Sequence, residues 1–140
     1  MDKIFFDTNI MLDFLSVRKP FFYPVSKILT LAEQKKVIVV LSPISFINTN
    51  YVLIKKENDL TVLEKLRKFK IICEVCDTDE LIIEKSLHSG FKDFEDAIQH
   101  STAFKSKDIE AIITRNSKDY RKSKIAVFTP EIYLTTHLES

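Results

Sequence analysis

Short apolar runs that alternate with segments of helical periodicity constrain the fold of this chain most strongly. The clearest run is VIVVL at residues 37–41, where every side chain is apolar, as expected for a strand buried on both faces of a parallel sheet. Similar short runs predict strands at residues 3–6, 71–75, 111–114 and 125–128. Strands that alternate with helices favour one α/β domain, over residues 1–140, around a mainly parallel sheet.

Local start and stop signals predict the helices between these strands. Asn9 is suited to cap a first helix that ends before Pro20. Ser42-Pro43 is typical of a helix start, and the helix after it carries Ile44, Ile47, Tyr51 and Ile54 at helical spacing. Further helices are predicted at residues 21–34, 60–69, 93–105 and 130–134, with another that starts near residues 77–80 and ends at residue 88.

Composition excludes several classes of protein. With 45% hydrophobic residues and one glycine in 140 residues, the chain is too apolar for a disordered segment. Its formal net charge of +1 does not by itself indicate a nucleic-acid partner. The longest aliphatic run, residues 37–41, is too short to cross a bilayer, so we expect a soluble, cytoplasmic protein with no membrane partner.

Cys73 and Cys76 form an isolated C-x-x-C pair. A zinc site would need two more ligands, and the three histidines offer no pair at ligand spacing. We therefore expect two reduced thiols that serve packing.

Polar side chains follow the first and fourth predicted strands, where a parallel sheet places its ligands. Asp7 follows the first strand, and Asn116 and Asp119 follow the fourth. Asp93 and Asp96 lie three residues apart and so share a helix face. Such a cluster of oxygen ligands suits Mg²⁺ or Mn²⁺ and the hydrolysis of a phosphodiester.

Each of these residues also has a purely structural interpretation. Asp7 and Asp93 are placed to cap helices, and Asp96 lies in a first helical turn, where an acid is stabilised by the helix dipole. Asn116 and Asp119 are ordinary turn residues. Near them, Arg115, Lys118 and Arg121 are candidates for binding RNA phosphates, although surface charges are more often simply solvated.

Taken in order, these pieces resemble the PIN-domain family, in particular its VapC-type toxins. The resemblance rests on Asp7-Thr8-Asn9, Ser42 with its helix, DFEDA at residues 93–97, ITRN at residues 113–116 with KDY at 118–120, and the closing TPE at 129–131. It implies a Rossmann-like five-stranded parallel sheet and a Mg²⁺- or Mn²⁺-dependent endoribonuclease. Many small members are toxins of toxin–antitoxin pairs, often homodimers that an antitoxin inhibits.

The resemblance also implies residue roles. Asp7 matches the first metal-binding acid and Asp96 the third, while Asn116 or Asp119 matches the fourth. Asn9 and Thr114 match supporting polar residues. The family's second acid falls on Asn48, which offers a neutral oxygen and no negative charge. Asp93, one turn before Asp96, is the expected substitute as catalytic residue and metal ligand.

Asn48 also supports an alternative, a degenerate PIN module that binds RNA or a protein without cutting. A phosphatase of the haloacid-dehalogenase type is rejected, because its general acid would be an aspartate at position 9, where this chain has Asn9.

Overall fold

A five-stranded sheet of order β3-β2-β1-β4-β5 lies at the centre of the computed structural model, which describes residues 1–138. Its strands are β1 (Asp2–Phe6), β2 (Val37–Leu41), β3 (Glu74–Val75), β4 (Ala111–Ile113) and β5 (Ala126–Phe128). Every neighbouring pair is parallel. The predicted α/β fold is confirmed, and β1 and β4 are adjacent, as the candidate site requires.

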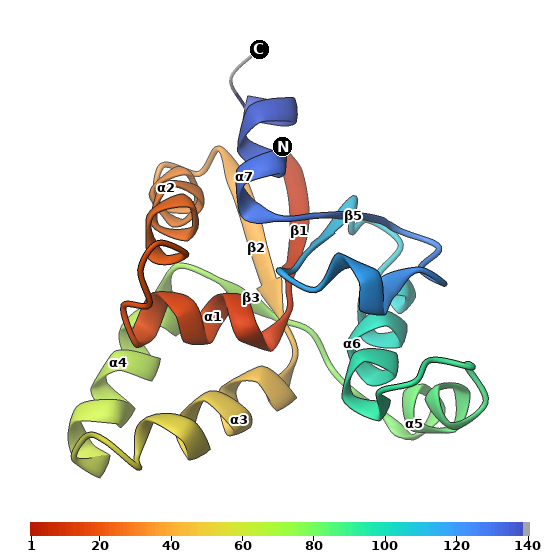
Figure 1. Ribbon diagram of the computed structural model, residues 1–140, viewed down its shortest axis with the longest axis horizontal. Helices are drawn as coiled ribbons and strands as arrows, with labels where there is room; N and C mark the ends of the chain where they lie inside the picture. The colour runs from red at the N-terminus through yellow and green to blue at the C-terminus, as the bar shows by residue number, and fades with distance from the viewer. Residues whose placement is uncertain (139–140) are drawn as a thin grey trace.

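Helices cover both faces of this sheet (Figure 1). On one side lie α1 (Thr8–Leu15), α2 (Phe22–Glu33), α3 (Pro43–Leu53) and α4 (Asp59–Ile71). On the other side lie α5 (Glu80–Leu87) and α6 (Phe94–Lys105). The chain closes with α7 (Pro130–Tyr133) and a π-helical turn, η2 (Leu134–Leu138), near the start of β1. None of the helices in residues 1–138 combines the length and apolar character needed to cross a membrane.

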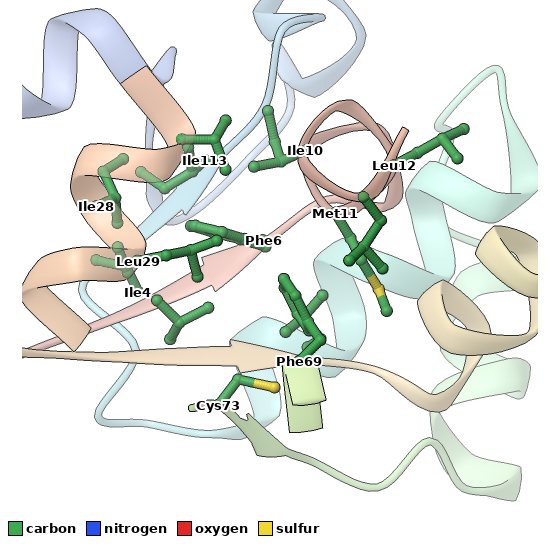
Figure 2. Packing of buried hydrophobic residues seen from close by; sticks show 14 of the residues in the cluster. Ile4, Phe6, Ile10, Met11, Leu12, Ile28, Leu29, Phe69, Cys73 and Ile113 are labelled. Carbon is green, nitrogen blue, oxygen red and sulfur yellow. The ribbon is translucent and has the colours of Figure 1, made fainter. Parts of the chain in front are cut away.

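The core forms because successive strand residues point to opposite faces. In β1, Ile4 and Phe6 pack under the α1–α4 layer, whereas Phe5 packs toward α6. Figure 2 shows Ile28 and Leu29 of α2 above β1. All five side chains are essentially inaccessible to water, and burying each contributes about 1.5–3 kcal/mol.

Two predictions about local structure were wrong. The third strand starts at Glu74, because α4 continues to Ile71 and leaves only two residues for the strand. A short apolar run fits a helix end as well as a strand, so periodicity could not separate them. The first helix is capped by Asp7, whose carboxylate accepts from the Thr8 amide, so Asn9 lies inside the helix. Most other element ends differ from the prediction by one or two residues.

The inner face of α3 is polar, which the apolar spacing of its sequence did not predict. Ser45, Thr49 and Leu53 are its buried residues, whereas Ile47 is 66% exposed and Tyr51 is 62% exposed. Ser45 contacts buried polar groups near the site described below. Ile47 and Tyr51 are therefore left on the surface.

Candidate active site

Asp7 lies at the carboxyl end of β1 and is almost completely buried. One carboxylate oxygen accepts from the Thr8 amide at 2.7 Å, and the other accepts from the Thr114 hydroxyl at 2.8 Å. Burial raises the pKa of Asp7, and these two hydrogen bonds oppose the rise. Thr114 follows β4 directly, so the pairing of β1 with β4 brings the two residues together.

Asp96, in the first turn of α6, lies in the field of several other acids. Burial, followed by the charges of Asp7, Asp93, Asp119 and Glu95, raises the pKa of Asp96 from 3.8 to about 7. Like charges act this way only over short distances. The structure thus brings Asp7, Asp93, Asp96 and Asp119 into one cluster, which we call the acid cluster together with Glu95.

The remaining predicted acid-site residues are exposed at its edge. Asp93 is the N-cap of α6, and its carboxylate accepts from the Asp96 amide at 2.9 Å. Asp119 lies in a 3₁₀ turn, η1 (Ser117–Tyr120), which Asn116 precedes. The backbone N–H of Asn116 donates to the Thr114 hydroxyl at 3.1 Å. Asp93 therefore does cap its helix, while its charge still acts on Asp96.

Glu95 is the residue that sequence reasoning missed. The Asn48 side-chain nitrogen donates to a Glu95 carboxylate oxygen at 2.6 Å, joining α3 to α6. Burial raises the pKa of Glu95, the Thr8 hydroxyl opposes the rise, and the charges of Asp7 and Asp93 add to it. A carboxylate thus stands beside the position where the family's second acid is absent, and it is Glu95 rather than Asp93 that contacts Asn48.

The helices that carry these acids are joined by a buried network without charges. Gln99 of α6 donates to the hydroxyls of Thr8 and Ser45 at 3.0 and 2.9 Å, and it accepts from Ser42 at 2.5 Å. The Thr8 and Ser45 hydroxyls also bond to each other at 2.9 Å. This network, Gln99 with Thr8, Ser42 and Ser45, fixes the starts of α1 and α3 against α6. Ser42 is the N-cap residue of α3, but its hydroxyl donates to Gln99 and makes no capping hydrogen bond.

Arg115, predicted to bind RNA, forms an ion pair with Asp13 within the fold. Its guanidinium donates to both oxygens of Asp13 at 2.6 and 3.1 Å and lies 4.1 Å from the ring centre of Phe21. Asp13 is fully buried, and Arg18 approaches it at 3.7 Å. Arg115 therefore neutralises a buried acid within the fold. Sequence gave no signal for this pair, because Asp13 resembles an ordinary polar position of a short helix.

Lys118 and Arg121 are exposed beside the acid cluster. With Asp93 and Asp119 they line a cavity of about 610 Å³, which we call the near cavity. Positive side chains thus surround one side of the cluster, as phosphate binding requires.

The donor set fits a hard divalent cation by its chemistry, but its side chains are not arranged around one point. Within residues 1–138, no three Asp, Glu, His or Cys side chains are placed to hold an ion without reorienting. Two observations favour a cation nonetheless. Burial, together with the charges of the neighbouring acids, raises the pKa of Asp96 to about 7, and a bound cation would offset both effects. The buried side-chain oxygen of Asn9, two residues after Asp7, has no hydrogen-bond partner within residues 1–138.

The two cysteines are free, as predicted. Burial raises the pKa of Cys73 to about 12 and that of Cys76 to about 11, so both remain thiols at neutral pH.

Solved structures with the same fold include a toxin–antitoxin complex and a toxin. The chain matches a toxin–antitoxin complex from Klebsiella pneumoniae with 26% identity and a TM-score of 0.67, over 91% of this chain and 97% of that one. FitAcB from Neisseria gonorrhoeae matches at 20% identity and a TM-score of 0.68, over 91% and 98%. VapC20 from Mycobacterium tuberculosis, a toxin that cleaves the sarcin–ricin loop, matches at 15% identity and a TM-score of 0.61, over 78% and 86%.

Sequence comparison gives a family but no individual relative. No curated protein matches the chain. A family model, the PIN domain, matches residues 3–118, which is most of the 140 residues and includes every acid of the cluster except Asp119. The chain therefore belongs to the PIN-domain family.

Proposed function

We propose that this protein is a metal-dependent endoribonuclease that hydrolyses RNA phosphodiester bonds, with Mg²⁺ or Mn²⁺ held by the acid cluster. The observation that carries the proposal is the crowding of carboxylates around Asp96 at the carboxyl ends of β1 and β4, next to a cavity with a basic rim. The likeness to VapC20, a toxin that cleaves the sarcin–ricin loop, supports the choice of reaction. An RNA substrate agrees with a cytoplasmic site of action.

In this proposal Asp7, Asp96 and Glu95 are the principal ligands, with Asp93 and Asp119 at the edge. Bound there, a divalent ion would lower the pKa of water and stabilise the negative charge that develops on the phosphate. Asn48 orients Glu95, and Thr114 orients Asp7. Lys118 and Arg121 hold the phosphates of the substrate. Asn9 and Asn116 support the site, and Arg115 is not included, because Asp13 occupies it.

The non-catalytic module is the alternative, and Asn48 favours it. Glu95 weakens that case, because a carboxylate is retained at the same place from another helix. The decisive experiment is cleavage of a labelled RNA by wild type and Asp96→Asn, with Mn²⁺ and with a chelator. Mn²⁺-dependent cutting that Asp96→Asn removes supports the nuclease. RNA binding without any cutting supports the module.

We further propose that the protein is the toxin of a toxin–antitoxin pair, and that its antitoxin binds an apolar groove between α3 and α4. Several matching structures are toxin–antitoxin complexes. The groove has a volume of about 660 Å³, is lined by Phe46, Ile47, Leu63, Leu66, Ile71 and Val75, and has Arg67 and Lys70 among its lining residues. Ile71 is 81% exposed, which is unusual for an isoleucine without a partner.

The charges of the groove indicate the chemistry of the partner. Its charged lining residues are basic, so they complement an apolar segment that carries carboxylates and oppose a symmetric pairing of two copies. The test is co-expression with the product of the adjacent gene, for wild type and Ile47→Asp. A complex that Ile47→Asp removes supports the antitoxin site. Self-association that Ile47→Asp removes would instead assign the groove to a homodimer.

A further inference from the structure

A second cavity adjoins the near cavity and extends away from the acid cluster. It has a volume of about 330 Å³ and lies between α5, α6 and the segment after η1; we call it the far cavity. Phe91 and Lys122 line both cavities. The two cavities therefore adjoin at these two residues, and we call them together the trough, which extends from Asp93 and Asp119 to Phe104.

The far end of the trough is strongly basic. The far cavity is lined by Lys85, Lys105, Lys122 and Lys124, and none of its lining residues among the described part of the chain is acidic. Lys105 is paired with Asp79, and Lys122 donates to the Gly90 carbonyl at 3.0 Å. Lys85 and Lys124 form no ion pair with any residue in 1–138, so their charges are available to a ligand.

Aromatic rings line the same wall in a row. His100 stacks between Phe91, at 5.1 Å, and Phe104, at 6.0 Å between ring centres. Burial lowers the pKa of His100, and its Nε2 accepts from the Lys124 amide at 3.1 Å, so this ring is neutral and fixed. Phe104 remains 47% exposed, with the Lys124 ammonium 5.5 Å from its ring centre.

We propose that the trough binds a single RNA strand on one side of the bond to be cut, with an unstacked base on Phe104 and backbone phosphates on Lys122, Lys124 and Lys85. The proposal rests on the proposed ribonuclease function, since it extends the same substrate beyond the acid cluster. An exposed aromatic face beside free lysines is the combination that binds single strands, because the ring stacks on a base while the lysines neutralise phosphates. Paired bases are already stacked and have no face to offer, so a duplex gains only the lysine contacts.

The test measures binding without cleavage, so that it does not depend on the nuclease. The probe is a fluorescent oligouridine of roughly eight nucleotides, titrated with the full chain in a chelator and followed by anisotropy. Phe104→Leu is expected to weaken binding by about fivefold or more, the loss of one stacked base. Lys124→Gln is expected to weaken it as well and to reduce the slope of log affinity against log salt by about 0.7.

The chain offers a matched control. Tyr51 of α3 and Lys55 form a similar exposed pair on the opposite side of the sheet from α5 and α6, with the ammonium 4.5 Å from the ring centre. Tyr51→Leu and Lys55→Gln should leave the affinity unchanged. An oligothymidine of equal length distinguishes RNA from DNA. A duplex RNA lacks the stacking contact, so Phe104→Leu should not alter its affinity.

The outcomes separate this proposal from the proposed function. Unchanged binding in both trough variants, or an equal loss in the control pair, overturns the trough even if RNA is cut in an Asp96-dependent reaction. Equal loss of duplex binding in Phe104→Leu overturns the base-stacking contact, and stronger binding of oligothymidine overturns RNA as the ligand. Weaker oligouridine binding in the trough variants but not in the controls supports the proposal, even if no metal produces cleavage. Thermal unfolding midpoints within a degree or so of wild type confirm that each variant is folded.

Discussion

The side-chain amide of Asn48 donates a 2.6 Å hydrogen bond to Glu95, so a neutral residue on α3 holds a carboxylate that belongs to α6. The resemblance to PIN domains implies an acid at position 48. In this chain an acid from α6 lies beside position 48, and the amide of Asn48 is hydrogen-bonded to it.

The carboxylate at position 95 and the amide at position 48 should together determine the affinity for Mn²⁺. Glu95→Gln should weaken Mn²⁺ binding by about tenfold or more, because a charge-assisted contact is worth roughly 1.5–3 kcal/mol, whereas Asp93→Asn should have a smaller effect. The double variant Asn48→Glu, Glu95→Gln should recover most of the affinity, since the pair is reversed and not lost. Titration calorimetry measures all three. Failure of the double variant to recover binding would show that the two positions are not equivalent.

Asp96 should make the metal-free protein pH-sensitive. Its pKa of about 7 in the folded state lies above the ordinary aspartate value of 3.8, so the folded state binds the proton more tightly than the unfolded state. This contribution to stability is fully present below about pH 4 and is lost as pH rises toward about 7. Asp96→Asn should therefore be more stable than wild type at pH 8 and lose less stability between pH 5 and 8. Thermal unfolding in a chelator measures the difference, which saturating Mn²⁺ should reverse in sign.

Substitution of Arg115 should lower the free energy of unfolding, whereas substitution of Arg121 should weaken RNA binding. Arg115→Gln leaves the buried Asp13 with only the more distant Arg18, and breaking a buried pair costs about 3–5 kcal/mol. Arg121→Gln, on the surface, should change the free energy of unfolding by no more than about 0.5 kcal/mol and should weaken RNA binding instead. Denaturant unfolding and anisotropy distinguish them. Equal stability of the two variants would contradict the role assigned to Arg115.

Gln99 should be required for the arrangement of the site. Gln99→Met leaves the hydroxyls of Thr8, Ser42 and Ser45 without their shared partner and should cost about 1–3 kcal/mol. It should also weaken Mn²⁺ binding, although Gln99 itself is not a proposed ligand. Ser26→Ala on α2 is a suitable control, because Ser26 contributes only a backbone carbonyl to its hydrogen bond with Thr30. A stable Gln99→Met protein with normal Mn²⁺ affinity would contradict this role.

Sequence reasoning succeeded where a single local signal decides the structure. The run at residues 37–41 became β2 with the predicted bounds, because four of its five aliphatic residues are β-branched and so favour a buried strand over a helix. The rule that ligands gather at the carboxyl ends of parallel strands predicted that Asp7 would lie close to the segment after the fourth strand if the two strands were neighbours, and β1 does pair with β4.

It failed where partners are distant in the chain. Glu95 precedes Asp96 by one residue, so helical geometry argued against a shared face, and only the fold shows that Asn48 meets it. The apolar spacing of α3 suggested a buried face, but Gln99 arrives from α6 and selects the polar side of the helix. The pairing of Arg115 with Asp13, which are 102 positions apart, left no local trace.

The network around Gln99 positions the helices of the site, whereas the acids carry its charge. Gln99, Thr8, Ser42 and Ser45 carry no charge and do not titrate at any pH from about 4 to 9, yet they set the positions of the helices that carry the carboxylates. Protonation or a bound cation therefore alters the charge of the acid cluster while the frame beneath it keeps its shape. The geometry of the site is thus set by uncharged hydrogen bonds, and its charge is set separately by the acids. An acid can therefore be supplied by α6 beside the position of Asn48, as Glu95 is, while the backbone of the fold stays the same.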